Sequence, residues 1–242
     1  MDFILDLHCH TVSSTHAYST VTENAMQAAA VGLTHVGISD HSPGMPGGAH
    51  RYHFMNMGAM PTHIHGVRVL KGIEVNITDT EGTLDFPDEM LSRMEFVIAS
   101  QHREVFIPST MADNTKAIVN AMDNPNTHII GHPNNSTYQV DIEAIVKAAA
   151  KTNTILEINN ATLKPGGYRN NGPDSFIEML RLCKALDVPI IAGSDAHYHQ
   201  YVGDFSNVKD LIIQSGIPAH LVLNTDIHLL TAAIAKKKGL AT

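Results

Sequence analysis

Predicted strands and helices alternate along almost the whole chain, and this alternation restricts the fold more than any other feature of the sequence. We expect strands over residues 3–7, 34–39, 67–73, 95–100, 128–131, 154–158 and 189–193. Helices are expected over residues 22–30, 87–93, 114–122, 142–151, 174–186 and 205–214, and a last helix follows Asp226. Strands separated by helices favour a parallel sheet, and a chain of 242 residues can close such a sheet into a (β/α) barrel.

One domain over residues 1–242 is predicted, because no linker, low-complexity tract or repeat divides the chain. An open doubly wound sheet is the structural alternative. It favours a glycine-rich first turn, whereas the first strand here is followed by histidine and serine. Residues 42–61 form a long segment rich in Gly, Pro, Met and His, and such segments often act as lids or walls of a site.

Residue types that favour helix ends support several of these boundaries. Thr22 is predicted as the N-cap of the first helix, and Gly32 would end it. Asp141 and Asp226 are predicted to cap two later helices. These caps divide the chain into repeated strand and helix units.

Side chains that bind metal ions follow one predicted strand after another. They are His8, His10 and the nearby His16, then His41, Glu74, His102, His132, Asp195 and His197. In a barrel these strand ends meet at one face, where the active site lies. Seven histidines and two acids are too many for one tetrahedral ion and suit three ions, particularly if one carboxylate bridges two of them.

The spacing of His8 and His10 also predicts which way the side chains of residues 8–10 point. Alternation along a strand places His8 and His10 on one face and Cys9 on the other. We therefore expect Cys9 to be a packed thiol that takes no part in metal binding.

Composition indicates a globular protein and argues against several kinds of partner and location. Hydrophobic residues make up 43% and charged residues 17%, as in an ordinary globular protein. A net charge of −8 argues against a surface that binds nucleic acid, and two cysteines provide no disulfide framework. Neither a signal sequence nor a membrane-spanning run is evident, so a cytoplasmic location without membrane contact is expected.

Several motifs together resemble the polymerase-and-histidinol-phosphatase (PHP) family. They are Asp6-Leu7-His8-Cys9-His10-Thr11, Ser14-Thr15-His16-Ala17-Tyr18-Ser19, Ser39-Asp40-His41, Gly72-Ile73-Glu74, His102, Gly131-His132-Pro133 and Gly193-Ser194-Asp195-Ala196-His197. Within that family, the segments at residues 50–57 and 156–160 are most similar to the YcdX-type metal-dependent phosphatases. The resemblance implies the PHP fold, a distorted seven-stranded TIM-like (β/α) barrel, and a trinuclear metal centre that usually contains zinc.

The resemblance also implies how three divalent ions are shared. The first site would contain His8, His10, Glu74 and Asp195; Glu74 would bridge to a second ion held by His102 and His132; and His16, His41 and His197 would form the third. Zinc is favoured by the histidine majority, and manganese and iron are alternatives. Asp40 is either a partner that orients an imidazole or a turn residue.

The centre that the resemblance implies predicts a phosphatase that hydrolyses a small phosphomonoester by attack of a metal-bound hydroxide. Glu74 and Asp195 would act in catalysis as metal ligands, while Arg51, His53 and Arg103 are candidate substrate contacts. No nucleic acid partner is expected. The resemblance is compatible with a homo-oligomer such as a trimer, although the residues themselves indicate no assembly state.

Two other functions remain open from the residues. An amidohydrolase-type C–N hydrolase also carries two histidines on its first strand, but its usual bridge is a carboxylated lysine. A non-catalytic metal-binding or regulatory module would need only tight ligation, whereas the 42–61 segment suggests that a ligand enters and leaves.

Overall fold

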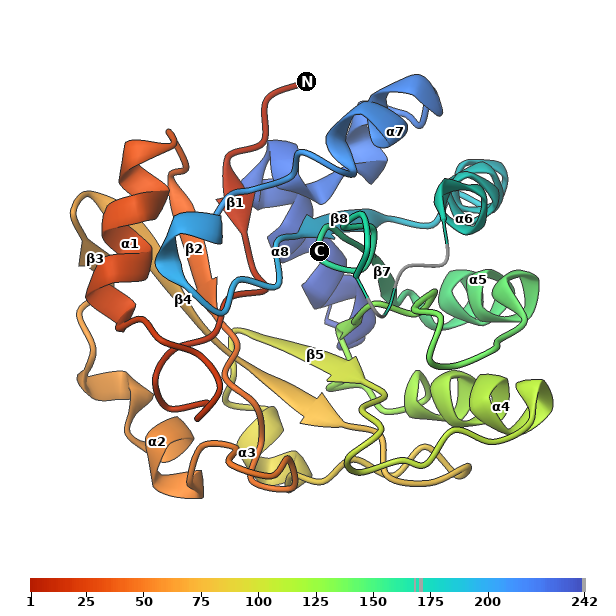
Figure 1. Ribbon diagram of the computed structural model, residues 1–242, viewed down its shortest axis with the longest axis horizontal. Coiled ribbons are helices and arrows are strands. Elements are labelled where there is room, and N and C mark those ends of the chain that lie inside the picture. Colours follow the sequence, from red (N-terminus) through yellow and green to blue (C-terminus); the bar gives the residue numbers. More distant parts are fainter. Residues whose placement is uncertain (168, 170–171, 241–242) are drawn as a thin grey trace.

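The computed structural model describes residues 1–167, 169 and 172–240. Within them, seven parallel strands form a sheet that nearly closes into a barrel (Figure 1). In order of pairing they are β1 (Leu5–Asp6), β2 (His35–Ile38), β4 (Val67–Asn76), β5 (Phe96–Ser100), β6 (Ile129–Ile130), β7 (Ile155–Asn159) and β8 (Ile190–Gly193). A short strand, β3 (His63–Ile64), pairs antiparallel to β4. The predicted fold class is therefore confirmed.

Helices connect the strands and surround the sheet, as Figure 1 shows for α1, α4, α5 and α6. The α-helices are α1 (Val21–Ala30), α2 (Arg51–Met55), α3 (Asp88–Leu91), α4 (Met111–Ala121), α5 (Ile142–Thr152), α6 (Pro173–Ala185), α7 (Lys209–Gln214) and α8 (Ile227–Lys237). Short 3₁₀ turns are η1 (Met57–Ala59), η2 (His199–Tyr201), η3 (Ala219–Leu221) and η4 (Leu223–Thr225). None of the helices in the described residues is long and apolar enough to cross a membrane.

The barrel closes between β1 and β8 through single contacts rather than a continuous ladder. Beyond the two strands, Cys9 and Ala196 form an isolated parallel bridge, in which the His10 amide donates to Ala196 O at 2.8 Å. Between the strands themselves, along the seam where β1 meets β8, the Asn224 side chain donates to Leu5 O (3.0 Å) and Ala192 O (2.9 Å). It also accepts from the Ala192 amide at 2.7 Å. These contacts bring the end of β1 beside the end of β8.

Two apolar clusters lie on the two sides of the sheet. The larger one fills the space between the sheet and the surrounding helices and includes Cys9, as predicted for a packed thiol. The smaller one fills the barrel interior with residues from successive strands and from α8, including Leu5, Leu70, Phe96, Ile98, Ile129, Ile155, Ile191 and Leu230. Because inward side chains recur every second residue, Leu70 and Glu74 share the inner face of β4. The apolar interior therefore ends directly below the polar groups at the strand ends.

Several element boundaries differ from the sequence predictions. Thr20, not Thr22, caps α1, because its hydroxyl accepts from the Glu23 amide while Glu23 accepts from the Thr20 amide in a capping box. The strand predicted over residues 67–73 continues to Asn76, since it remains paired with β5 up to Ser100.

Other local predictions are confirmed or refined. Asp141 and Asp226 cap α5 and α8 as predicted. The 42–61 segment contains α2 and η1 rather than irregular chain throughout. The helix predicted over residues 205–214 is shorter than expected, because α7 begins only at Lys209.

Candidate metal centre

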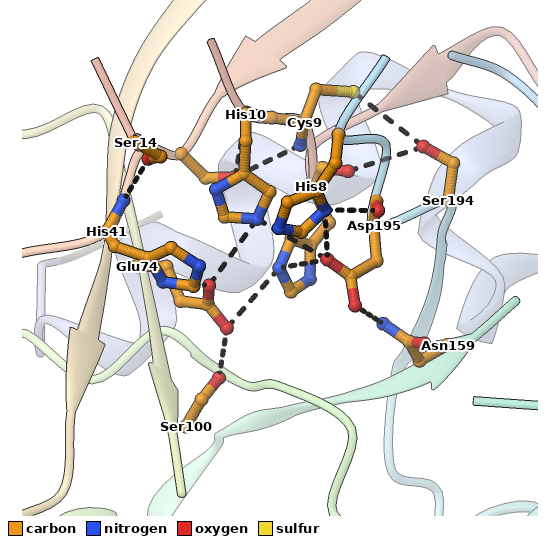
Figure 2. Close-up of polar contacts among 12 residues, drawn as sticks. His8, Cys9, His10, Ser14, His41, Glu74, Ser100, Asn159, Ser194 and Asp195 are labelled. Atoms are coloured by element: carbon orange, nitrogen blue, oxygen red, sulfur yellow. Dashed lines mark hydrogen bonds and ion pairs between the residues drawn. The ribbon is translucent and has the colours of Figure 1, made fainter. Parts of the chain in front are cut away.

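Glu74 lies at the centre of a buried cluster of imidazoles (Figure 2). Its two carboxylate oxygens lie within 3.5 Å of five rings: His8 Nε2 (3.3 Å), His10 Nε2 (3.5 Å), His41 Nδ1 (2.9 Å), His102 Nε2 (3.4 Å) and His132 Nε2 (3.2 Å). The Ser100 hydroxyl donates to Glu74 Oε1 at 2.7 Å and holds the carboxylate in place. Glu74, in β4, thus contacts histidines that follow four other strands: β1, β2, β5 and β6.

Asp195 and the remaining histidines complete the group. Asp195 Oδ1 lies 3.5 Å from His8 Nε2 and 3.4 Å from His10 Nε2. The His16 ring lies 5.0 Å from that of His41 and 4.7 Å from that of His197, measured between centroids. The structure therefore gathers all nine predicted ligand residues at the carboxyl ends of the strands.

The backbone turns sharply at two of these residues. His132 has a φ of 30° and Asp195 a φ of 57°, in the left-handed region that residues other than glycine seldom adopt. Backbone strain of this kind persists where surrounding contacts impose it, and it is concentrated at functional sites. The turns at the ends of β6 and β8 aim both side chains at Glu74 and its neighbours.

Buried atoms in the cluster lack hydrogen-bond partners. Within the part of the chain that the structure describes, this holds for His8 Nε2, His10 Nε2, His41 Nδ1 and Glu74 Oε2. Three groups of side chains have ligand atoms within 4.8 Å of one another: His8, His10 and Glu74; His41, Glu74 and His102; and His10, His41 and His197. Buried polar atoms are normally satisfied, and imidazole and carboxylate are ligands of divalent transition metals. The cluster therefore fits metal ions.

Burial and charge favour protonation states that suit metal binding in three members of the cluster. Burial raises the pKa of Glu74, but the neighbouring His8, His102 and His41 outweigh it and hold the pKa well below its usual range. Burial likewise opposes ionisation of Asp195, while Arg169 and His8 lower its pKa well below the ordinary value. Burial, together with His197 and His41, lowers the pKa of His10 well below its usual range. Both carboxylates and the neutral His10 ring are in the forms that coordinate metals. At His8 burial lowers the pKa, but the carboxylates of Glu157, Glu74 and Asp195 outweigh it and raise the pKa well above its usual range.

Further polar groups contact the imidazoles on the side away from Glu74. Glu157 Oε1 lies 2.7 Å from His8 Nδ1, and Asn76 Oδ1 lies 2.8 Å from His102 Nδ1. Neither residue was among the predicted site residues. Glu157 occurs inside an apolar strand, and a charged residue at an inward position of such a strand is the sequence signal that could have identified it.

A cavity of about 390 Å³ opens above the cluster. It is lined by His16, His41, Met45, Pro46, His102, Glu104, Arg169, Asp195 and His197. Met45 and Pro46 come from the 42–61 segment, which therefore forms part of the wall of the site. Arg169 Nη2 lies 2.6 Å from Asp195 Oδ2 and places a positive charge at this cavity.

The three predicted substrate contacts do not line this cavity. Arg51 lines a separate groove of about 640 Å³ between α2 and α3. Arg103 is exposed, and His53 faces Asp40, with 3.1 Å between Nε2 and Oδ2. Their contact with a substrate stays a prediction.

Asp40 lies beside an imidazole, although it is that of His53 rather than one of the nine. The same carboxylate accepts from the Thr11 amide at 2.7 Å and from the Ser14 hydroxyl at 2.8 Å. Ser14 Oγ in turn accepts from the His41 amide at 3.0 Å. Asp40 therefore ties α2 to the loop that leads to His16.

The chain is similar to known proteins over nearly its whole length. The family model of the PHP domain matches residues 6–161. A "probable phosphatase" of Thermoanaerobacter sp. (strain X514) is 44% identical over 239 residues, which cover 98% of this chain and 97% of the relative. A "probable phosphatase" of Clostridium novyi (strain NT) is 40% identical over 239 residues, with 99% and 97% covered.

Among solved structures, the chain is similar in fold to histidinol phosphate phosphatase from Lactococcus lactis, which was crystallised with zinc, L-histidinol and phosphate. The TM-score is 0.62 at 18% sequence identity, and the match covers 88% of this chain and 94% of that one.

Proposed function

The chain belongs to the PHP family, and on this premise we propose that it hydrolyses a small phosphomonoester at a centre of three divalent metal ions. Its place in the family, together with relatives of 40–44% identity that are named probable phosphatases, makes it a phosphatase. The number of ions and the size of the substrate are the parts that we propose.

The observation that carries the proposal is the contact of Glu74 with five imidazoles within 3.5 Å. A single ion has too few coordination positions for nine ligand residues, whereas a shared carboxylate suits neighbouring ions. We assign His8, His10, Glu74 and Asp195 to one ion, Glu74, His102 and His132 to a second, and His16, His41 and His197 to a third. Zinc is the preferred metal because most of the ligands are imidazoles, and manganese and iron remain alternatives.

Bound divalent ions supply Lewis-acid activation of water and offset negative charge on phosphate oxygens. The chain's own residues would hold and orient the substrate. Arg169 is the candidate for phosphate binding, because its guanidinium lies at the cavity and can donate two hydrogen bonds to a phosphate. The apolar interior below Glu74 would keep bulk water from the lower side of the centre.

The cavity supports a small substrate. Its volume of about 390 Å³ lies near the lower end of the range for small-molecule sites, ~300–1,000 Å³. The amidohydrolase alternative is less well supported, since no lysine is among the described residues that line the cavity. Glu74 is instead the bridge that we propose.

Elemental analysis of the purified protein, paired with hydrolysis of p-nitrophenyl phosphate, tests the proposal. We expect close to three ions per chain, loss of activity after chelation, and recovery when zinc or manganese is returned. One ion or none, with no hydrolysis in any divalent metal, would contradict it and favour a binding module.

A further inference from the structure

We propose that Glu157 is a positioning residue that orients His8 for metal binding, an inference that rests on the proposed metal-dependent function. Glu157 lies in β7 and is only 1% exposed. It is not one of the nine proposed metal ligands. A carboxylate so deeply buried needs hydrogen-bond donors or positive charges beside it, and two of its partners belong to residues of the proposed metal centre.

The first partner is the His8 ring. Glu157 Oε1 lies 2.7 Å from His8 Nδ1, while His8 Nε2 faces Glu74 at 3.3 Å and Asp195 at 3.5 Å. With Nδ1–H donating to Glu157, the lone pair on Nε2 is directed at the centre. The contact thus selects both the tautomer and the ring orientation that coordination requires.

The second carboxylate oxygen anchors Glu157 itself. The His132 amide donates to Glu157 Oε2 at 2.7 Å, and the Asn159 side-chain amide donates to it at 3.1 Å. His132 is the residue with the left-handed backbone at the end of β6. One carboxylate therefore orients the ring of His8 and holds the backbone of His132.

The neighbouring strand leaves room for this carboxylate. A Cβ atom at Gly193 would lie 2.0 Å from Glu157 Oε1 and 3.0 Å from His8 Cβ. Any side chain at this position would displace the carboxylate from His8. The glycine that precedes Ser194-Asp195 is thus explained by the space that Glu157 occupies.

His102 provides a contrast within the same centre. Its Nδ1 contacts a neutral amide oxygen, that of Asn76, at 2.8 Å. An ionised acceptor makes a stronger hydrogen bond and increases electron density on the metal-facing nitrogen. Loss of the Glu157 charge should therefore weaken metal binding mainly in the group formed by His8, His10 and Glu74.

The test is a competition titration with a chromophoric zinc chelator on the fully loaded wild type and Glu157→Gln, which keeps the size of the side chain. We expect one of three ions to bind about 10- to 100-fold more weakly in the variant, with the other two little changed. Proton NMR gives a second readout: a downfield imidazole N–H resonance assigned by its loss in Glu157→Gln.

Glu95→Gln is the matched control. Glu95 precedes β5, at the opposite end of the barrel, and its carboxylate pairs with Arg68 at 2.5 Å. We expect this variant to keep all three affinities and the downfield resonance. If Glu157→Gln does not fold, Glu157→Asp serves instead, since it keeps the charge but is one methylene shorter and should show the same selective loss.

Wild-type affinities in the Glu157 variant, or an equal loss in Glu95→Gln, would overturn the role of Glu157 while leaving the proposed function intact. A wild type that binds no ions would instead overturn the proposed function.

Discussion

Arg169 shows how a single side chain can be placed by the fold without a signal in the neighbouring sequence. It comes from the chain beyond β7 and reaches the cavity, where its guanidinium contacts Asp195 at 2.6 Å. Arg51 lies in the 42–61 segment and Arg103 follows the candidate ligand His102, but neither lines the same cavity. An arginine close in sequence to a candidate ligand therefore need not lie at the cavity, and one distant in sequence can.

We expect Arg169→Ala to lower kcat/KM for a phosphomonoester by roughly 10- to 100-fold, because charge-assisted hydrogen bonds contribute about 1.5–3 kcal/mol. Steady-state kinetics of Arg169→Ala, Arg103→Ala and Arg51→Ala, all fully loaded with metal, would rank the three side chains. A larger loss in either of the other two variants would argue against the assignment of phosphate binding to Arg169.

Helix α1 links local sequence to the site through its amino-terminal turns. Its capping box begins at Thr20, and four residues later the Asn24 side-chain amide donates to His10 O at 2.9 Å. The start of the helix therefore determines which residue supports the backbone of His10. Thr22 lies in the first turn and is exposed, so it does not have the capping role that its residue type indicated.

Thr20→Ala should lower the free energy of unfolding by about 1 kcal/mol, because the amide of Glu23 loses its acceptor. Thr22→Ala is the matched control and should change it by less than about 0.5 kcal/mol. Urea unfolding of both variants, followed by circular dichroism, measures the difference. Equal effects, or a larger effect at Thr22, would contradict the observed cap.

At the scale of the whole molecule, the barrel depends on the seam between β1 and β8. Asn224 is fully buried there and makes three hydrogen bonds to the backbone of Leu5 and Ala192. Together with the bridge between Cys9 and Ala196, it brings His8 and His10 next to Asp195. A seam of few contacts makes each of them important for closure.

Asn224→Ala should destabilise the protein by roughly 2–4 kcal/mol, since it leaves buried backbone groups of both strands without partners. Asn124→Ala removes a surface hydrogen bond to Asp88 and the acceptor of the Asn126 amide, and should cost about 1 kcal/mol. Urea unfolding of the metal-free proteins separates closure of the barrel from metal binding. Similar shifts for the two variants would show that the seam does not depend on Asn224.

The sequence alone determined the features that depend on short-range pattern. Alternating strands and helices predicted the parallel barrel, and the two-residue period of strands placed Cys9 in the core and away from His8 and His10. Ligand types at strand ends predicted which nine residues would gather, because parallel strands present their carboxyl ends at one face.

Only the tertiary structure decided which distant groups touch. His8 and Glu157 are 149 positions apart, and Asn224 bonds to Leu5 across 219 positions. Such contacts depend on the register of each strand pair and on how the barrel closes, and neither is encoded in the periodicity of one segment. For the same reason the positions of Arg169 above the centre and of His53 beside Asp40 could not be predicted from their sequence neighbours.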